Sequence, residues 1–215
     1  MLPKGYAYRI AFCVFRGFNM DIFELYVVNM KYVRNLKNIE KKRTGRTNTI
    51  LSVSSQTHKE GRPFVGIIHM VSGMKYCIPF SSIEKKSKYL SMAENITFRK
   101  IKNDEGDVIG ILNINNMIPV REEYISKFII DELPTDSKEQ ADYKRKCKQE
   151  LEWCNNNASE ILRLATELHS IICENRSFKK RNICPNYKEL EKECSKQKKI
   201  SKRNIKKQLI RKTKP

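Results

Sequence analysis

The fold is decided by residues 62–85, RPFVGIIHMVSGMKYCIPFSSIEK. Two runs within this stretch, 64–71 and 75–79, are rich in β-branched and aromatic residues, which favour strands. Between them stands Ser72-Gly73, a dipeptide typical of tight hairpin turns. The stretch therefore predicts two adjacent antiparallel strands.

Polar side chains stand at the outer ends of both predicted strands. Arg62 precedes the first strand, and Ser81, Ser82 and Lys85 follow the second. The outer ends of a hairpin meet at one edge of a sheet, so we expect positive charge and hydroxyl donors to lie together there. Such an edge suits a phosphodiester, whose oxygens accept hydrogen bonds and whose charge needs a cation.

The residues before this hairpin predict a strand and a helix. The strand covers 23–28, and Asn29 is placed to cap a helix over roughly 30–42. Apolar residues at helical spacing predict that one face of this helix is buried. This buried stripe consists of Tyr32, Val33, Leu36 and Ile39.

The residues after the hairpin predict a second hairpin, with strands over 96–101 and 108–113 around the turn 103–106. Two further short strands are expected over 117–120 and 124–130.

From about residue 136 the apolar residues follow a helical period. The pattern predicts either one long helix or two helices broken near 155–157, and then a short helix over 186–194. The apolar stripe, which should cover the sheet, consists of Cys147, Leu151, Cys154, Ala158, Ile161, Ala165, Leu168 and Ile172. The whole pattern predicts an α+β domain with a small, curved, mostly antiparallel sheet and packed helices.

The charge of the chain predicts a polyanionic partner. The 215 residues carry a formal charge of +19, with a pI near 9.7. Residues 195–215 hold ten cations and no acid, so this tail adds non-specific affinity for phosphates. RNA, DNA and an anionic membrane surface all fit, and a protein that is merely basic is the alternative.

The cysteine and histidine content argues against a metal centre or a disulfide framework. Seven cysteines include no Cys-x-x-Cys pair, which favours reduced thiols in a cytoplasmic protein, and three scattered histidines form no metal triad. We expect neither a cofactor nor a membrane span. His58, near Arg62, is a freer acid–base candidate than His69, for which a structural role within a strand is expected.

Residues 1–19 are expected to lie outside the folded domain. Residues 1–19 make a poor signal peptide and are too short to cross a membrane, so we interpret them as an upstream misread before Met20 or as a short extension. The domain itself is expected over 20–194.

RNA can be cleaved when its 2′-hydroxyl attacks the adjacent phosphate. A protein then has to assist deprotonation, balance the phosphoryl charge and protonate the leaving oxygen. Arg62, Ser81, Ser82 and Lys85 would supply cations and hydroxyls if they converge, and Tyr32 would add a phenol or a stacking surface.

Each of these residues also has a structural interpretation. A Ser-Ser pair after a strand is often a helix cap, Arg62 and Lys85 fit solvated charges, and Tyr32 fits the buried stripe of its helix. Chemistry alone therefore leaves both interpretations open.

The order of four segments resembles the ToxN/AbiQ family, the endoribonuclease toxins of type III toxin–antitoxin systems. The segments are LYVVNMKYV at 25–33, RPFVGI at 62–67, KYCIPFSS at 75–82 and NINNMIPV at 113–120. The resemblance covers roughly residues 20–194.

This resemblance implies a compact, strongly bent antiparallel sheet with helices, related to the MazF and Kid toxins. It implies metal-independent RNA cleavage that leaves 2′,3′-cyclic phosphate and 5′-hydroxyl ends. It also implies a repeat-containing antitoxin RNA as partner, closed RNA–protein assemblies and a role in phage defence.

Carried over by residue, the resemblance makes Ser82, Ser81, Arg62, Tyr32 and Lys85 the expected catalytic group. Basic residues are expected to hold flanking phosphates: Lys41, Lys42, Arg43 and Arg46 at the start of a polar loop, with Lys86 and Lys88.

The chain departs from the family pattern at two of these positions. Arg62 stands where the family often has a lysine. Ile83-Glu84 replaces a common Pro-Lys pair, so Lys85 is either a shifted equivalent or a second basic position.

Two other functions remain open on the sequence. A non-catalytic RNA-binding protein would bind RNA without cutting it, and a DNA-binding regulator is disfavoured because no helix-turn-helix pattern stands out.

Overall fold

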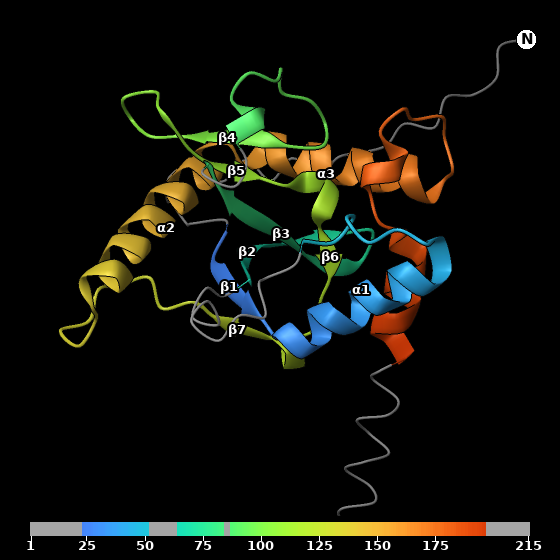
Figure 1. Cartoon of the computed structure of the whole chain (residues 1–215), viewed down its shortest axis with the longest axis horizontal. Coiled ribbons are helices and arrows are strands. Elements are labelled where there is room, and N and C mark those ends of the chain that lie inside the picture. The colour runs from blue at the N-terminus through green and yellow to red at the C-terminus, as the bar shows by residue number, and fades with distance from the viewer. Residues whose placement is uncertain (1–22, 52–63, 84–86, 197–215) are drawn as a thin grey trace, which may run out of the picture.

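The computed structural model describes residues 23–51, 64–83 and 87–196. Within them, seven strands form one antiparallel sheet in the order β4-β5-β3-β2-β1-β7, and β6 pairs with β3 beside this path (Figure 1). The strands are β1 Leu25–Val28, β2 Phe64–Val71, β3 Met74–Ser82, β4 Arg99–Lys102, β5 Val108–Leu112, β6 Ile118–Pro119 and β7 Ile125–Lys127. The predicted α+β class with an antiparallel sheet is confirmed.

The β2–β3 hairpin matches its prediction at the turn. Ser72 has φ 50° and Gly73 has φ 81°, and two positive φ values are what a two-residue turn matching strand twist requires. β3 is longer than predicted, because its last three residues pair with β5. Ser81 and Ser82 therefore form the end of β3. Ile83, directly after them, is in 3-10 conformation, so the interpretation of the pair as a helix cap stays open.

Gly66 lets the two strands of this hairpin approach closely. It pairs with Pro79, and a Cβ at Gly66 would lie 2.3 Å from the carbonyl oxygen of Ile78. No side chain fits at that distance without moving the strand.

Helix α1 (Met30–Thr44) begins at the predicted cap. Asn29 Oδ1 accepts hydrogen bonds from the backbone N–H groups of Lys31 and Tyr32, at 2.9 and 3.4 Å. The fourth expected member of the stripe, Ile39, is half-buried, and Glu40 is buried instead. Glu40 tolerates burial because Arg46, Thr44, Thr49 and the backbone N–H of Asn186 surround its carboxylate.

The long helical pattern is broken into two helices. Helix α2 (Lys138–Asn156) starts with a capping box between Ser137 and Gln140, and helix α3 (Ala158–Cys173) follows after Asn157. A further helix begins at Tyr187 and continues through residue 196, and we call it the terminal helix. Short 3-10 helices are η3 Ser87–Tyr89, η4 Ile114–Asn116, η5 Glu122–Tyr124 and η6 Arg181–Ile183.

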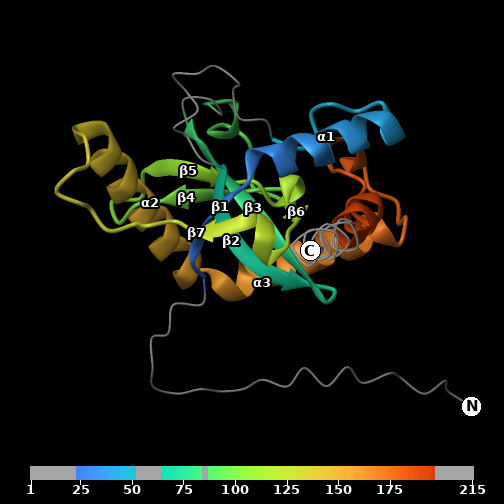
Figure 2. The same ribbon diagram turned by 90° about the horizontal axis from the view of Figure 1, so that it is seen from below.

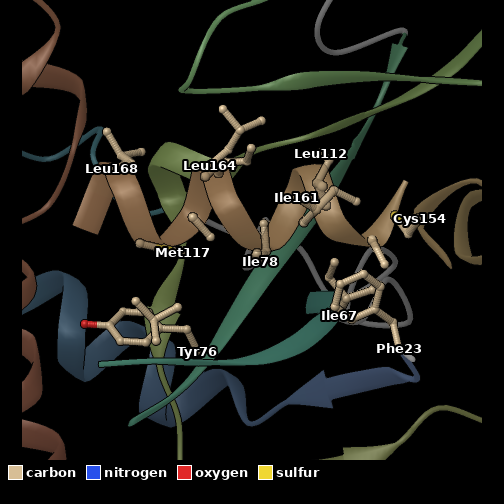
Figure 3. Close-up of a cluster of buried hydrophobic side chains, with 14 of the residues drawn as sticks. Phe23, Ile67, Tyr76, Ile78, Leu112, Met117, Cys154, Ile161, Leu164 and Leu168 are labelled. Atoms are coloured by element: carbon tan, nitrogen blue, oxygen red, sulfur yellow. The ribbon is translucent and has the colours of Figure 1, made fainter. Parts of the chain in front are cut away.

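The sheet has a hydrophobic core on each face. Tyr76 and Ile78 of β3 pack in the core that α3 covers, together with Ile161, Leu164 and Leu168 of α3 (Figure 3). Cys77, between them on the strand, belongs to the second core. α1 and α3 lie on opposite sides of the sheet (Figure 2). This alternation sets the direction of every later side chain on β3.

Among the described residues, no helix is both long enough and apolar enough to span a bilayer.

Candidate functional site

The two serines lie at the end of β3, where that strand pairs with β5. Ser81 is opposite Ile111 and Ser82 is opposite Gly110, and both serine side chains are half-buried. Successive residues of a strand point to opposite faces, so Ser82 faces the side of α2 and α3 and Ser81 faces the side of α1. The sequence predicts that the two hydroxyls lie together. In the structure they point to opposite faces of the sheet, because the two serines are neighbours on a strand.

Ser81 is oriented by a buried carboxamide. Asn113, which has no exposed surface, donates a hydrogen bond from Nδ2 to Ser81 Oγ at 3.0 Å. The same nitrogen donates to the carbonyl oxygens of Pro79 and Ile111, which fixes the carboxamide. Because Ser81 accepts from Asn113, its own hydroxyl hydrogen can be donated to a ligand.

Ser82 shares its face of the sheet with a buried carboxyl group that sequence reasoning missed. A Cβ on Gly110, the partner of Ser82, would lie 2.4 Å from Glu150 Oε1, so the carboxyl group packs directly on this glycine. Glu150 is 4% exposed, and its burial raises the pKa of the carboxyl to about 7. The sequence does hold one sign of this burial: Glu150 lies between Cys147 and Cys154 on the predicted apolar stripe of the helix.

The structure places Tyr32 in a core, which agrees with the structural interpretation. Its side chain is 3% exposed, and its hydroxyl donates to the carbonyl oxygen of Pro119 at 2.8 Å. Burial raises the pKa of this phenol far above its usual range. The half-buried Tyr124 stacks on it, with ring centres 4.2 Å apart, and Arg121 lies 5.8 Å from the centre of the Tyr124 ring. Tyr124 is therefore the more accessible ring of this pair.

Some of the predicted phosphate-binding residues are exposed to solvent, and another makes hydrogen bonds within the protein. Lys41, Lys42 and Arg43 are exposed on the last turn of α1, and not in a loop as expected. Arg46 follows Gly45, which ends the helix, and its guanidinium donates to the carbonyl oxygens of Arg181 and Cys184. Arg46 thus holds the end of α1 against the segment before the terminal helix.

Lys88 is exposed, with its Nζ 5.5 Å from the centre of the Tyr89 ring. Arg62, Lys85 and Lys86 lie outside the described residues, as do His58 and residues 1–19. The convergence of Arg62 and Lys85 with the serines therefore stays a prediction.

His169 is the centre of a buried polar network. Its Nε2 lies 2.8 Å from Glu191 Oε1, its Nδ1 lies 3.2 Å from Ser72 Oγ, and Tyr76 donates to Glu191 at 2.7 Å. Burial alone would lower the pKa of His169, but contacts with Cys173 and the Glu191 carboxylate raise it to about 9. The network ties the β2–β3 turn and α3 to the terminal helix.

No group of three His, Cys, Asp or Glu side chains in the described part of the chain is arranged to hold a metal ion.

Three solved structures share this fold with a TM-score of 0.61. One was solved in work on selective toxin inhibition by a non-coding RNA pseudoknot in type III toxin–antitoxin systems; it is 17% identical and aligns over 82% of this chain and 98% of its own. Another is AbiQ, a lactococcal anti-phage endoribonuclease, which is 14% identical over the same shares of the two chains. The fold is thus that of type III toxin–antitoxin toxins.

A comparison of sequences identifies the family of this chain. The model of the ToxN toxin family of type III toxin–antitoxin systems matches residues 24–195, and the chain belongs to this family. This confirms the resemblance seen in the four short segments.

Two curated relatives are similar to this chain. The endoribonuclease ToxN of Pectobacterium atrosepticum is 22% identical over 154 residues, which cover 71% of this chain and 83% of the relative. The endoribonuclease ToxN of Bacillus thuringiensis subsp. kurstaki is 31% identical over 78 residues, which cover 36% of this chain and 38% of the relative.

Proposed function

We propose that this protein is an endoribonuclease toxin that cuts RNA without a metal ion and leaves 2′,3′-cyclic phosphate and 5′-hydroxyl ends. A repeat-derived antitoxin RNA would be both its processed substrate and its inhibitor, held with it in a closed RNA–protein assembly that acts in phage defence. Membership of the ToxN family carries the proposal, and the oriented hydroxyl of Ser81 at the end of β3 supports it.

In this mechanism the protein stabilises charge on the phosphate during attack by the 2′-hydroxyl. Ser82 donates to a non-bridging oxygen of the scissile phosphate, while Ser81, which points to the opposite face, donates to a neighbouring group of the same RNA. Arg62 and Lys85 balance the charge that develops. Donors fixed before the reaction stabilise this charge without reorganising, as Asn113 allows for Ser81.

The serine assignment is tested by cleavage of RNA in EDTA, with the 5′-hydroxyl ends read by their labelling with a kinase. Ser82→Ala is expected to lower the rate constant for cleavage roughly 100-fold, the usual cost of removing one donor to a developing oxyanion. Ser81→Ala is expected to have a smaller effect. Ser126→Ala is a matched control, because Ser126 is an exposed serine on β7 of the same sheet.

Four results would contradict the proposal at different points. Intact RNA after incubation with the parent protein would leave an RNA-binding protein without nuclease activity. Cleavage by Ser82→Ala at the parent rate would remove Ser82 from the mechanism, and a larger loss in Ser81→Ala would exchange the two roles. DNA upstream of the gene without tandem repeats would argue against the antitoxin RNA.

A further inference from the structure

A pocket of about 250 Å³ lies on the described surface, and none of its lining residues belongs to β3. It is formed where the segment just after α1, the end of α3 and the start of the terminal helix meet. Its lining includes Arg46, Cys173, Asn175, Arg181, Asn186 and Lys188. These segments lie side by side in both views of the molecule (Figures 1 and 2). Its volume is slightly below the roughly 300–1,000 Å³ of pockets for drug-sized ligands, so it suits a single small ligand group such as one nucleotide.

The lining of the pocket carries positive charge and no carboxylate. Arg181 donates to the carbonyl oxygens of Ile171, Ile172 and Arg176, which fixes its guanidinium at the end of α3. Arg46 is fixed in the same way by two carbonyl oxygens and by Glu40, which is almost fully buried. Each guanidinium has N–H donors beyond those used in these contacts. Two cations are thus held in place before any ligand arrives.

The remaining lining residues fit a nucleobase. Ile172 and Pro185 are buried and offer apolar surface against a ring, while Asn175 and Asn186 offer carboxamides that both donate and accept hydrogen bonds. Unstacked RNA bases are recognised by such contacts with their faces and edges. A free inorganic anion would use the cations but neither the carboxamides nor the apolar surface.

We propose that this pocket binds one unstacked nucleotide of the RNA held by the protein, with its phosphate on the cations and its base between the apolar residues and the two carboxamides. The choice of RNA rests on the function proposed above. Lys41, Lys42 and Arg43 are exposed on the last turn of α1, which ends two residues before Arg46. Arg43 is paired with Glu189 at 3.6 Å, so Lys41 and Lys42 extend the positive charge of the pocket along the helix. A single-stranded segment would follow these charges into the pocket.

Cys173 provides a direct probe of this pocket. Its side chain is half-buried, whereas the other described cysteines are buried, and its Sγ lies 3.4 Å from His169 Nε2. In a Cys13→Ser background, a maleimide is expected to label Cys173 first. A bound nucleotide that fills the pocket would cover this thiol.

The experiment measures how fast maleimide labels Cys173 with and without a short single-stranded RNA that carries 2′-O-methyl groups and so cannot be cleaved. At an RNA concentration roughly ten times its dissociation constant, labelling is expected to slow about 10-fold, because only the unbound fraction then exposes the thiol. Inorganic phosphate and a mixture of nucleoside monophosphates at equal phosphate concentration serve as the competing probes and are expected to protect far less.

A double variant, Asn175→Gly with Lys188→Ala, tests the same pocket through affinity. Asn175 has φ 58°, a conformation that glycine adopts freely, so this change removes the carboxamide without straining the backbone. We expect the dissociation constant of the 2′-O-methyl RNA, measured by fluorescence anisotropy, to rise about 10-fold, as for the loss of one or two polar contacts. Lys179→Ala is the control, since Lys179 is exposed on the same segment but does not line the pocket.

The outcomes separate this inference from the proposed nuclease. Unchanged labelling of Cys173 in the presence of saturating RNA would overturn the pocket assignment, as would parent-like affinity of the double variant. Equal protection by phosphate alone would reduce the pocket to an anion site, and stronger protection by the monophosphates would make it a free-nucleotide site; either contradicts the inference. RNA protection in a protein that cuts no RNA would uphold the pocket and defeat only the nuclease proposal.

Discussion

At the scale of single residues, Glu150 makes the clearest link between burial and pH. Its carboxyl has a pKa of about 7 in the folded protein against 4.5 for an exposed glutamate, because burial disfavours the charged form. The folded state therefore holds its proton more tightly than the unfolded state does. As the pH rises from the unfolded pKa through the folded one, the cost of burying the charge appears and the protein loses stability.

Glu150→Gln removes this cost while keeping the shape of the side chain. We expect the variant to be more stable than the parent by up to about 3 kcal/mol at roughly pH 8, and nearly equal to it at roughly pH 4. Urea unfolding at both pH values measures the difference. Glu152→Gln is the control, because Glu152 is exposed on the same helix. A pH-independent difference would show that ionisation of Glu150 is not the cause.

The directions and contacts of single side chains are what the sequence predicts least well. It identified Ser81 and Ser82 as candidates but placed their hydroxyls together, because the pairing of β3 with β5 that sets their directions depends on residues about thirty positions away. The sequence also predicts that Arg46 contacts RNA phosphates, but it does not show that this guanidinium donates to carbonyl oxygens 135 and 138 residues further along the chain. Such long-range contacts leave no local pattern.

At the scale of elements, Gly66 controls how β2 and β3 pack. Gly66→Ala would place a methyl group against the carbonyl oxygen of Ile78, so we expect a loss of about 3 kcal/mol or more in the free energy of unfolding. Gly45→Ala is the comparison: a Cβ there meets open space, and only the positive φ of 72° costs about 1 kcal/mol. Thermal and urea unfolding would show the order of the two variants. A smaller loss at Gly66 than at Gly45 would mean that the strands separate easily.

Elements with a strong local signal were predicted well. The Ser72-Gly73 turn, the Asn29 cap and the apolar stripe across α2 and α3 each depend on residues close in sequence. The sequence does not decide between one helix and two, because three consecutive asparagines at 155–157 do not show whether or where a helix ends. The structure places the break at Asn157.

At the scale of the whole molecule, charge governs the strength of RNA binding. Truncation after residue 196 removes nine of the ten cations that lie beyond residue 194, and the net charge falls to 19 − 9 = +10. Because each phosphate contact releases counterions, the truncated protein is expected to bind RNA more weakly and with a shallower dependence of log affinity on log salt. Titrations of RNA at several salt concentrations measure the slope, and an unchanged slope would show that the tail does not contact RNA.

The truncation should leave the positions of cleavage unchanged, because the candidate serines lie on β3. The fold class and the family could both be predicted from the sequence, since they depend on the order of many weak local signals. The pocket could not, because three segments from distant parts of the chain form it.

The contacts between α1 and the terminal region have a consequence for the making of the protein. The backbone N–H of Asn186 donates to Glu40, 146 positions earlier, and Leu190 and Cys194 complete the core beneath α1. A ribosome therefore has to translate nearly the whole domain before this core can close. A chain that is released early or is still being synthesised lacks both that core and the pocket beside it. The fold of this toxin is therefore complete only after residue 194 has been translated.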